Sequence, residues 1–163
     1  MKKAVYNSPL GNIVIEMEGR CLTGLYFSDE TALSNSNNND KALRKVALWL
    51  DGYFSGKNKT ADFQINQKGT PFQRAVWAEL EQIPYGTTCT YGQISSQLAA
   101  RLGKQKVSPR AVGRAVGCNK IAIIIPCHRV IGANGKLTGH AWGLERKEKL
   151  LKFEKHCRDQ FDL

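Results

Sequence analysis

Residues 90–117 read TYGQISSQLAARLGKQKVSPRAVGRAVG, and they hold the clearest signals of secondary structure in the chain. A capping-box pattern at Thr90 predicts a helix that runs to Gly103, since a Ser or Thr followed three residues later by Gln or Glu is typical of a helix start. Ser108 precedes a proline and predicts a second start, for a helix that ends near Gly117. Two short helices joined by a basic turn predict a helix-turn-helix.

The residues after this helix pair predict a wing. Residues 121–125 form a continuous apolar run, which predicts a buried strand. Asn134-Gly135 predicts the turn of a β-hairpin, and a last helix is expected from about Glu145 to His156. Helix, turn, helix and hairpin in this order are typical of a winged-helix DNA-binding domain.

The residues before it predict a separate domain at 1–68, with the helix-turn-helix domain at 69–163. Residues 12–18 and 21–27 alternate in polarity, which predicts antiparallel strands. Asp40 is a good N-cap for a helix that Gly56 stops, and a last strand is expected near Phe63. The polar stretch at 34–40 predicts a mobile loop. The capping box at Thr70 opens the next helix and sets the domain boundary.

Charge is distributed unevenly along the chain. The 24 Lys and Arg residues exceed the 14 Asp and Glu residues, which makes the net charge +10. No acidic residue occurs between Glu81 and Glu145. That interval carries Arg101, Lys104, Lys106, Arg110, Arg114, Lys120, Arg129 and Lys136. An acid-free basic stretch favours a surface that faces phosphates, because a merely solvated surface more often mixes both signs.

The helix over 110–117 has an unusual composition. Gly113 and Gly117 each cost about 1 kcal/mol relative to alanine. Tight packing on another helix and close approach to DNA both explain them. Arg110 and Arg114 lie one turn apart and favour the DNA phosphates. The helix lacks long side chains suited to reading bases, which disfavours a sequence-specific repressor and favours the minor groove.

Several classes are excluded by simple counts. No run reaches the roughly 18 apolar residues of a membrane span, and the N-terminus has no signal-peptide core. The five cysteines are an odd number without a CxxC pair, which indicates a reduced, cytoplasmic protein. Cys127 and His128 are adjacent, but the other cysteines and histidines lack the spacing of metal ligands, so no metal site is expected.

Residues 126–129, Pro-Cys-His-Arg, carry the chemistry. A cysteine beside a histidine is a candidate activated nucleophile, because the thiolate is the reactive form. Glu154, on the last helix, is a candidate to orient His128. Arg129 has two interpretations: it ties this turn to the preceding domain, or it lowers the pKa of the thiol.

These residues resemble a known family, the O6-alkylguanine-DNA alkyltransferases, also called methylated-DNA–protein-cysteine methyltransferases. Residues 125–130, Ile-Pro-Cys-His-Arg-Val, are similar to the family's signature. Residues 110–113 with Asn119 resemble its recognition helix and hinge. Further matching segments lie at 8–11, 22–25, 69–73, 76–77, 83–86 and Tyr91, so the resemblance spans nearly the whole chain.

The resemblance implies an α+β fold. A small N-terminal antiparallel sheet with a helix, ribonuclease-H-like, precedes a C-terminal winged-helix domain with the active-site cysteine. It also implies direct repair of O6-alkylguanine in double-stranded DNA, with O4-methylthymine as a further candidate lesion. The alkyl group moves irreversibly to the cysteine after base flipping, so each protein acts once. No cofactor is needed, and a monomer is expected.

The resemblance also assigns roles to individual residues. Cys127 accepts the alkyl group, His128 takes its proton through a water, Glu154 holds His128, and Asn119 braces the turn. Arg110 fills the gap in the base stack, and Tyr91 assists extrusion. The expected DNA-binding residues are Arg110, Tyr91, Arg114, Ala111, Gly113 and Thr90. The expected pocket residues are Tyr91, Val130, His140, Ala141 and Trp142.

Two pocket positions depart from the family. Many members have tyrosine where this chain has His140, and glycine where it has Trp142. The Ala141 backbone N–H is still expected to reach the guanine O6. We expect Trp142 to narrow the pocket, so that methyl adducts react well and benzyl adducts poorly; alternatively, Trp142 packs sideways as core. The turn at 102–108 is also longer than in compact members.

Other functions remain open from the residues alone. A non-catalytic lesion-binding protein keeps the groove-binding helix but replaces the cysteine, which is present here. A cysteine hydrolase with Cys127, His128 and Glu154 leaves the basic stretch unexplained. A winged-helix regulator lacks base-reading side chains on its third helix. An S-adenosylmethionine-dependent methyltransferase is disfavoured, because no glycine-rich loop follows a first strand.

Overall fold

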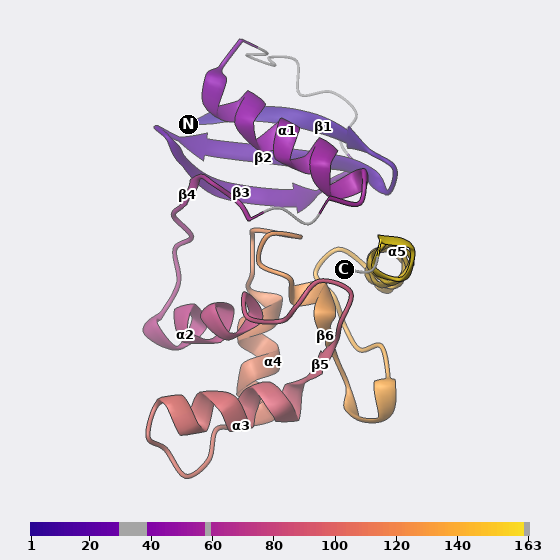
Figure 1. Ribbon diagram of the computed structural model, residues 1–163. Helices are drawn as coiled ribbons and strands as arrows, with labels where there is room; N and C mark the ends of the chain where they lie inside the picture. The colour runs from indigo at the N-terminus through magenta and orange to yellow at the C-terminus, as the bar shows by residue number, and fades with distance from the viewer. Residues whose placement is uncertain (30–38, 58–59, 162–163) are drawn as a thin grey trace. The chain divides into compact units, whose positions relative to one another are not determined.

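The computed structural model describes residues 1–29, 39–57 and 60–161. The chain divides into two compact units, Met1–Lys68 and Gly69–Leu163 (Figure 1). None of the helices in the described part has both the length and the apolar character that a bilayer crossing requires.

A four-stranded sheet in the order β1-β2-β3-β4 forms the base of the first unit. Strands β1 (Lys2–Ser8), β2 (Gly11–Glu18) and β3 (Cys21–Phe27) pair antiparallel. The predicted strands β2 and β3 are confirmed, and Gly19 makes the turn between them with φ +61°. Strand β1 was missed because its side chains are half-buried or exposed and show no clear alternation.

Strand β4 (Gln64–Ile65) pairs parallel with β3, so the sheet is mixed rather than wholly antiparallel. Helix α1 (Lys41–Phe54) lies between these strands in the sequence. A crossover through a helix returns the chain to the same direction, whereas a tight hairpin turn reverses it. The direction of a two-residue strand is therefore set by the connection and not by its own residues.

Helix α1 begins and ends where the sequence predicts. The Asp40 carboxylate accepts hydrogen bonds from the backbone N–H groups of Ala42 and Leu43 at 2.9 and 3.2 Å. Gly56 follows the helix with φ +80°. One face is buried and consists of Leu43, Val46, Leu50 and Tyr53. Of the loop predicted at 34–40, residues 34–38 lie outside the described residues.

Three helices form the core of the second unit. They are α2 (Pro71–Leu80), α3 (Tyr91–Arg101) and α4 (Pro109–Gly117). The predicted capping boxes at Thr70 and Thr90 are both present, and Ser108 caps α4. The helices pack on one another around Val76, Leu80, Ile94, Leu98 and Val112.

A buried hydrogen bond joins α2 to α4. The indole Nε1 of Trp77 donates to the Ala115 carbonyl at 2.9 Å. This bond fixes the position of α4 against α2. The opposite face of α4 lies outside the core and exposes Arg110 and Arg114. Helices α3 and α4 with their connecting turn are the predicted helix-turn-helix (Figure 1).

The strand predicted at 121–125 is wrong. The segment is buried but folds into tight turns, in which the Ile125 N–H donates to the Ile121 carbonyl at 3.1 Å. Ile123 has φ +69°, a conformation rare for a β-branched residue. The Asn119 side chain replaces a neighbouring strand: it accepts from the Ile121 N–H at 3.0 Å and donates to the Ile125 carbonyl at 2.9 Å.

The predicted β-hairpin is also wrong. Strand β6 (Val130–Ile131) pairs in parallel with β5 (Cys89–Thr90), which comes from far upstream. Asn134-Gly135 does form a turn with positive φ, but no returning strand follows it in the described part of the chain. The last helix, α5 (Leu144–Phe161), extends beyond the predicted end because no glycine or proline follows His156 to stop it.

Candidate active site

The Pro-Cys-His-Arg motif forms a single buried turn. Residues Cys127–Arg129 make a 3₁₀ turn, in which the Arg129 N–H donates to the Pro126 carbonyl at 3.0 Å. Cys127 is 3% exposed, and His128 has no exposed surface. A tight turn directs three consecutive side chains apart, so Cys127 faces a cavity while the next two residues face α5.

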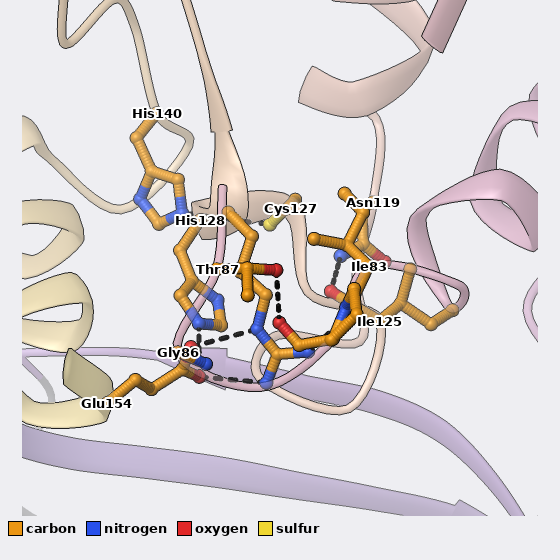
Figure 2. A network of polar contacts seen from close by, with 11 residues as sticks. Ile83, Gly86, Thr87, Asn119, Ile125, Cys127, His128, His140 and Glu154 are labelled. Carbon is orange, nitrogen blue, oxygen red and sulfur yellow. Dashed lines mark hydrogen bonds and ion pairs between the residues drawn. The ribbon is translucent and has the colours of Figure 1, made fainter. Parts of the chain in front are cut away.

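A polar network adjoins the cysteine (Figure 2), and it joins His128 and Arg129 to Glu154. His128 Nε2 lies 2.7 Å from Glu154 Oε1, as the sequence predicted for this pair. Arg129 donates to both carboxylate oxygens of Glu154, at 2.8 and 2.9 Å, and to the Ile83 carbonyl at 2.8 Å. Burial by itself raises the pKa of Glu154, but His128 and Arg129 outweigh it and hold that pKa well below its usual range.

This network revises the first interpretation of Arg129, a tie to the preceding domain, and does not support the second. Its guanidinium is bound to Glu154 and to the Ile83 carbonyl, and it lies 5.5 Å over the Tyr85 ring. It is not among the groups that shift the pKa of Cys127. Arg129 therefore ties the turn to the rest of the second unit, and it is too buried to join a surface that faces phosphates.

The thiol of Cys127 is protonated at neutral pH. Burial raises its pKa to about 11, and a hydrogen bond from Asn119 and the charge of Lys147 lower it only in part. The sulfur lies 3.6 Å from Nε2 of His140. In Figure 2, Cys127 lies between His140 and Asn119.

Lys147 is a site residue that the sequence analysis missed. It has no exposed surface, its Nζ donates to the Thr138 carbonyl at 3.0 Å, and burial lowers its pKa. The surrounding stretch ERKEK resembles a solvated helix face. The signal was the helical spacing of Lys147, Leu150, Glu154 and Cys157, which places all four on one buried face of α5.

A cavity of about 410 Å³ opens over the sulfur. Its wall consists of Tyr91, Gly113, Val116, Gly117, Cys127, Thr138, Gly139, His140 and Ala141. Tyr91, His140 and Ala141 thus lie where the sequence places them. Val130 is fully buried and does not line the cavity. Trp142 does not line it either and packs edge-on against His140, with ring centroids 5.1 Å apart.

The glycines of α4 border this cavity, which bears on their two explanations. A methyl group added at Gly113 would meet only the Tyr91 ring, at an ordinary 3.7 Å, and one at Gly117 would meet nothing within 4 Å. Tight packing on another helix is therefore not the reason for either glycine in the described part of the chain.

The remaining candidates for contact with DNA differ in exposure and in whether they already have a partner within the protein. Arg110 and Arg114 are exposed on α4 and have no ion-pair partner in the described residues. Ala111 is half-buried beside them. The Thr90 hydroxyl is occupied as the cap of α3, where it accepts from the Gln93 N–H at 3.1 Å.

Two family models match the chain, and together they cover both units. A "6-O-methylguanine DNA methyltransferase, ribonuclease-like domain" matches residues 1–67, and the "DNA binding domain" of the same name matches residues 71–156. The chain belongs to the O6-methylguanine-DNA methyltransferase family.

Individual members of the family agree along almost the whole chain. The methylated-DNA–protein-cysteine methyltransferase of Methanosarcina acetivorans is 44% identical over 161 residues, which is 96% of this chain and 100% of that protein. The Mycolicibacterium paratuberculosis protein of the same name is 41% identical over 152 residues, 91% of this chain and 89% of its own.

Solved methyltransferase structures have the same fold. The Mycobacterium tuberculosis protein in complex with DNA superposes with a TM-score of 0.79 at 39% identity, and covers 94% of this chain and 92% of its own. A Methanococcus jannaschii O6-methylguanine DNA methyltransferase superposes with a TM-score of 0.69 at 26% identity, over 93% of each chain. The family resemblance read from the motifs is therefore confirmed.

Proposed function

We propose that this methyltransferase repairs O6-alkylguanine in duplex DNA by moving the alkyl group once and irreversibly to Cys127. The observation that carries the proposal is a buried thiol at the wall of a 410 Å³ cavity bordered by the exposed helix α4. DNA repair by alkyl transfer to a cysteine is the activity of the family, and DNA is its partner. The acceptor residue, the lesion and a monomeric state are our proposals.

DNA binding is assigned to the exposed face of α4. Arg114 contacts a phosphate, which supplies affinity without sequence readout. Arg110 enters the base stack and fills the gap that the flipped nucleotide leaves. The lack of a side chain at Gly113 and Gly117 keeps the helix slim where the base passes into the cavity.

The cavity receives the flipped base. Tyr91 and the Ala141 backbone N–H lie in its wall and are assigned to hold the guanine, with the N–H on O6. His128 Nε2 is engaged by Glu154, so its buried Nδ1, which has no protein partner in the described residues, is the free base nitrogen. Nδ1 takes the thiol proton through a water molecule.

The transfer itself is a single displacement. The sulfur's electron pair forms the bond to the alkyl carbon as the carbon–O6 bond breaks, and guanine keeps the electron pair of the broken bond. Guanine gains one proton, which balances the proton that His128 takes from the thiol. The positive charge of Lys147 lowers the pKa of Cys127 and so favours the thiolate. The thioether has no leaving group to restore the thiol, so one protein repairs one base and no cofactor is consumed.

The decisive experiment is peptide mass analysis after mixing with a duplex that carries one O6-methylguanine. The peptide with Cys127 gains one methylene mass in stoichiometric amount, and Cys127→Ala shows no gain while still binding the duplex. Binding without any gain in the wild type would instead support a lesion-binding protein. If the wild type shows neither binding nor a mass gain, the next test is reaction with the acyl substrates of a cysteine hydrolase. An O4-methylthymine duplex tests the further lesion in the same assay.

The expected adduct range rests on His140 rather than on direct narrowing of the cavity by Trp142. Trp142 does not enter the wall of the cavity, but it braces the His140 ring beside the sulfur. We therefore assign the limit on adduct size to the His140 ring, and we predict fast repair of methyl adducts and slow repair of benzyl adducts. Single-turnover rates on the two duplexes check this, and equal rates would contradict it. Trp142→Gly should raise the benzyl rate more than the methyl rate.

A further inference from the structure

Two histidines flank Cys127, and the proposed chemistry uses only one of them. His128 is bound to Glu154 through Nε2. His140, from the segment before α5, has its own Nε2 3.6 Å from the sulfur, within the range of a hydrogen bond to sulfur. It is half-buried in the cavity wall, and the Trp142 ring holds it edge-on at 5.1 Å.

The direction of this hydrogen bond follows from the other contacts of the sulfur. The Asn119 side chain and the backbone N–H groups of Cys127 and His128 all lower the pKa of the thiol, so they donate to the sulfur. A backbone N–H cannot accept a hydrogen bond, and Oδ1 of Asn119 already accepts one from the Ile121 N–H. The contact left for the S–H donor is Nε2 of His140, which accepts a proton only when the ring is neutral.

The surroundings of His140 keep it neutral. Burial lowers its pKa to about 4, and the neighbouring His128 and Lys147 act in the same direction. The backbone of Gly143 opposes them with a smaller effect. With Cys127, these are the titratable and polar groups that act on the ring from the turn, α5 and its own loop.

We propose that, in the DNA-free protein, Nε2 of His140 accepts a hydrogen bond from the S–H group of Cys127. This hydrogen bond keeps Cys127 protonated as a thiol until a base fills the cavity. The role of Cys127 as alkyl acceptor rests on the proposed function, but the hydrogen bond does not. His140 is a positioning residue in this scheme. A hydrogen bond that exists only in the protonated form stabilises that form, so the contact suppresses reaction with stray electrophiles.

Alkyl transfer requires that the hydrogen bond between Cys127 and His140 be broken. The base enters a cavity whose wall includes His140, and it displaces the ring from the sulfur. The S–H proton then leaves for His128 by the route proposed above, and the freed electron pair attacks the alkyl carbon. Reactivity of the thiol is thereby coupled to occupation of the cavity.

The first test is nitrogen NMR of the three histidines in the DNA-free protein. We expect His140 to be neutral from about pH 8 to about pH 5.5, with its proton on Nδ1, and its Nε2 signal to move in Cys127→Ala. His140→Gln assigns the signal. A proton on Nε2, or titration near the ordinary histidine value of about 6.5, would overturn the proposal.

The second test is the rate at which iodoacetamide modifies Cys127 without DNA, read by peptide mass. His140→Phe removes the acceptor, and we expect a rate about two- to tenfold higher at pH 8, as expected for loss of one hydrogen bond. His140→Gln keeps an acceptor and should react like the wild type. Exposed Cys118 is an internal control for folding and reagent.

An unchanged or lower rate in His140→Phe, with Cys118 unaffected, would contradict the proposal. Neither test uses DNA or alkyl transfer, so failure of the proposed function leaves both readouts intact. Conversely, a methylated Cys127 in the repair assay combined with an Nε2–H tautomer of His140 would reject this inference alone.

Discussion

Glu154 has no exposed surface, and it accepts hydrogen bonds from Arg129 on both carboxylate oxygens. Such a buried carboxylate stays ionised only because its partners compensate for lost hydration. Its negative charge holds the proton on Nε2 of His128 and leaves Nδ1 as the basic nitrogen. In the proposed mechanism, the reactivity of Cys127 therefore depends on the charge of Glu154, which acts through His128.

Glu154→Gln tests this dependence. The amide keeps the shape but loses the charge, so we expect methyl transfer to slow by about 10²-fold, at the lower end of general-base effects. DNA affinity should not change, because Glu154 is buried and is not part of the exposed face of α4 to which DNA binding is assigned. Single-turnover kinetics and DNA titration check both. Glu148→Gln, half-exposed on the same helix, is the matched control and should react like the wild type.

Helix α4 contains two glycines, which lower its stability relative to alanine but leave it without side chains at these positions. Its two glycines lack side chains where the cavity begins, although the space beside them is open. Trp77 on α2 holds the helix from behind through the Ala115 carbonyl. Helix α4 is thus held on one face by Trp77 and has no side chain at Gly113 and Gly117, which line the cavity.

Gly113→Ala and Gly117→Ala should therefore separate stability from repair. We expect each to raise the free energy of unfolding by up to about 1 kcal/mol, because alanine is the better helix former. Methyl transfer should slow, because the added methyl groups narrow the cavity entrance. Thermal melting and single-turnover rates measure the two effects.

The control for these variants is Gly103→Ala at the end of α3. Gly103 has φ +64°, so alanine should lower stability there by about 1 kcal/mol without slowing repair. A loss of stability in Gly113→Ala would instead show that the α4 glycine is needed for packing.

Over the whole molecule, positive charge is distributed unevenly between the two units. Residues 1–68 carry nine basic and seven acidic residues, and residues 69–163 carry fifteen and seven. Most of the excess positive charge thus belongs to the unit that holds the helix-turn-helix. DNA binding should depend on salt through that unit.

Arg114→Ala should weaken binding to all duplexes alike. We expect the slope of log affinity against log salt to fall by about 1, because one phosphate contact is lost. Arg110→Ala should reduce repair more than binding, since its assigned role is in the base stack. Fluorescence anisotropy at several salt concentrations measures the slope. Lys57→Ala in the first unit is the control and should leave the slope unchanged.

Stability of the second unit should fall in acid. The pKa of His140 is lowered to about 4 in the folded protein, below the ordinary value of 6.5. The unfolded chain therefore binds the proton first, so stability is full above about pH 6.5 and is lost as the pH falls towards 4. Glu154, whose pKa is also lowered, extends the loss below its ordinary value of 4.5.

Melting curves between about pH 7 and pH 4 check this expectation. The melting temperature should fall less steeply for His140→Phe than for the wild type. A melting temperature that does not change between pH 7 and pH 5 would contradict it.

The residues differ in how far their positions were predictable. Asp40, Thr70, Thr90 and Ser108 were correctly predicted as helix starts, because a cap bonds only to its own first turn. The pairing of His128 with Glu154 was a candidate from the residue types, was assigned by the family resemblance, and is present. The hairpin after Val130 was wrong, because its strand partner, β5, lies about forty residues upstream.

The family and the helices of both units were predictable without the structure, since they depend on local caps, periodicity and a contiguous motif. The tertiary structure alone decided that Ile121–Ile125 folds into turns around Asn119 and that Lys147 is buried. It also decided that His140 meets the sulfur. Burial of Lys147 and the approach of His140 to the sulfur depend on how separate segments pack. The Asn119 bonds are local, but they need a backbone with Ile123 at positive φ, which an apolar run does not indicate.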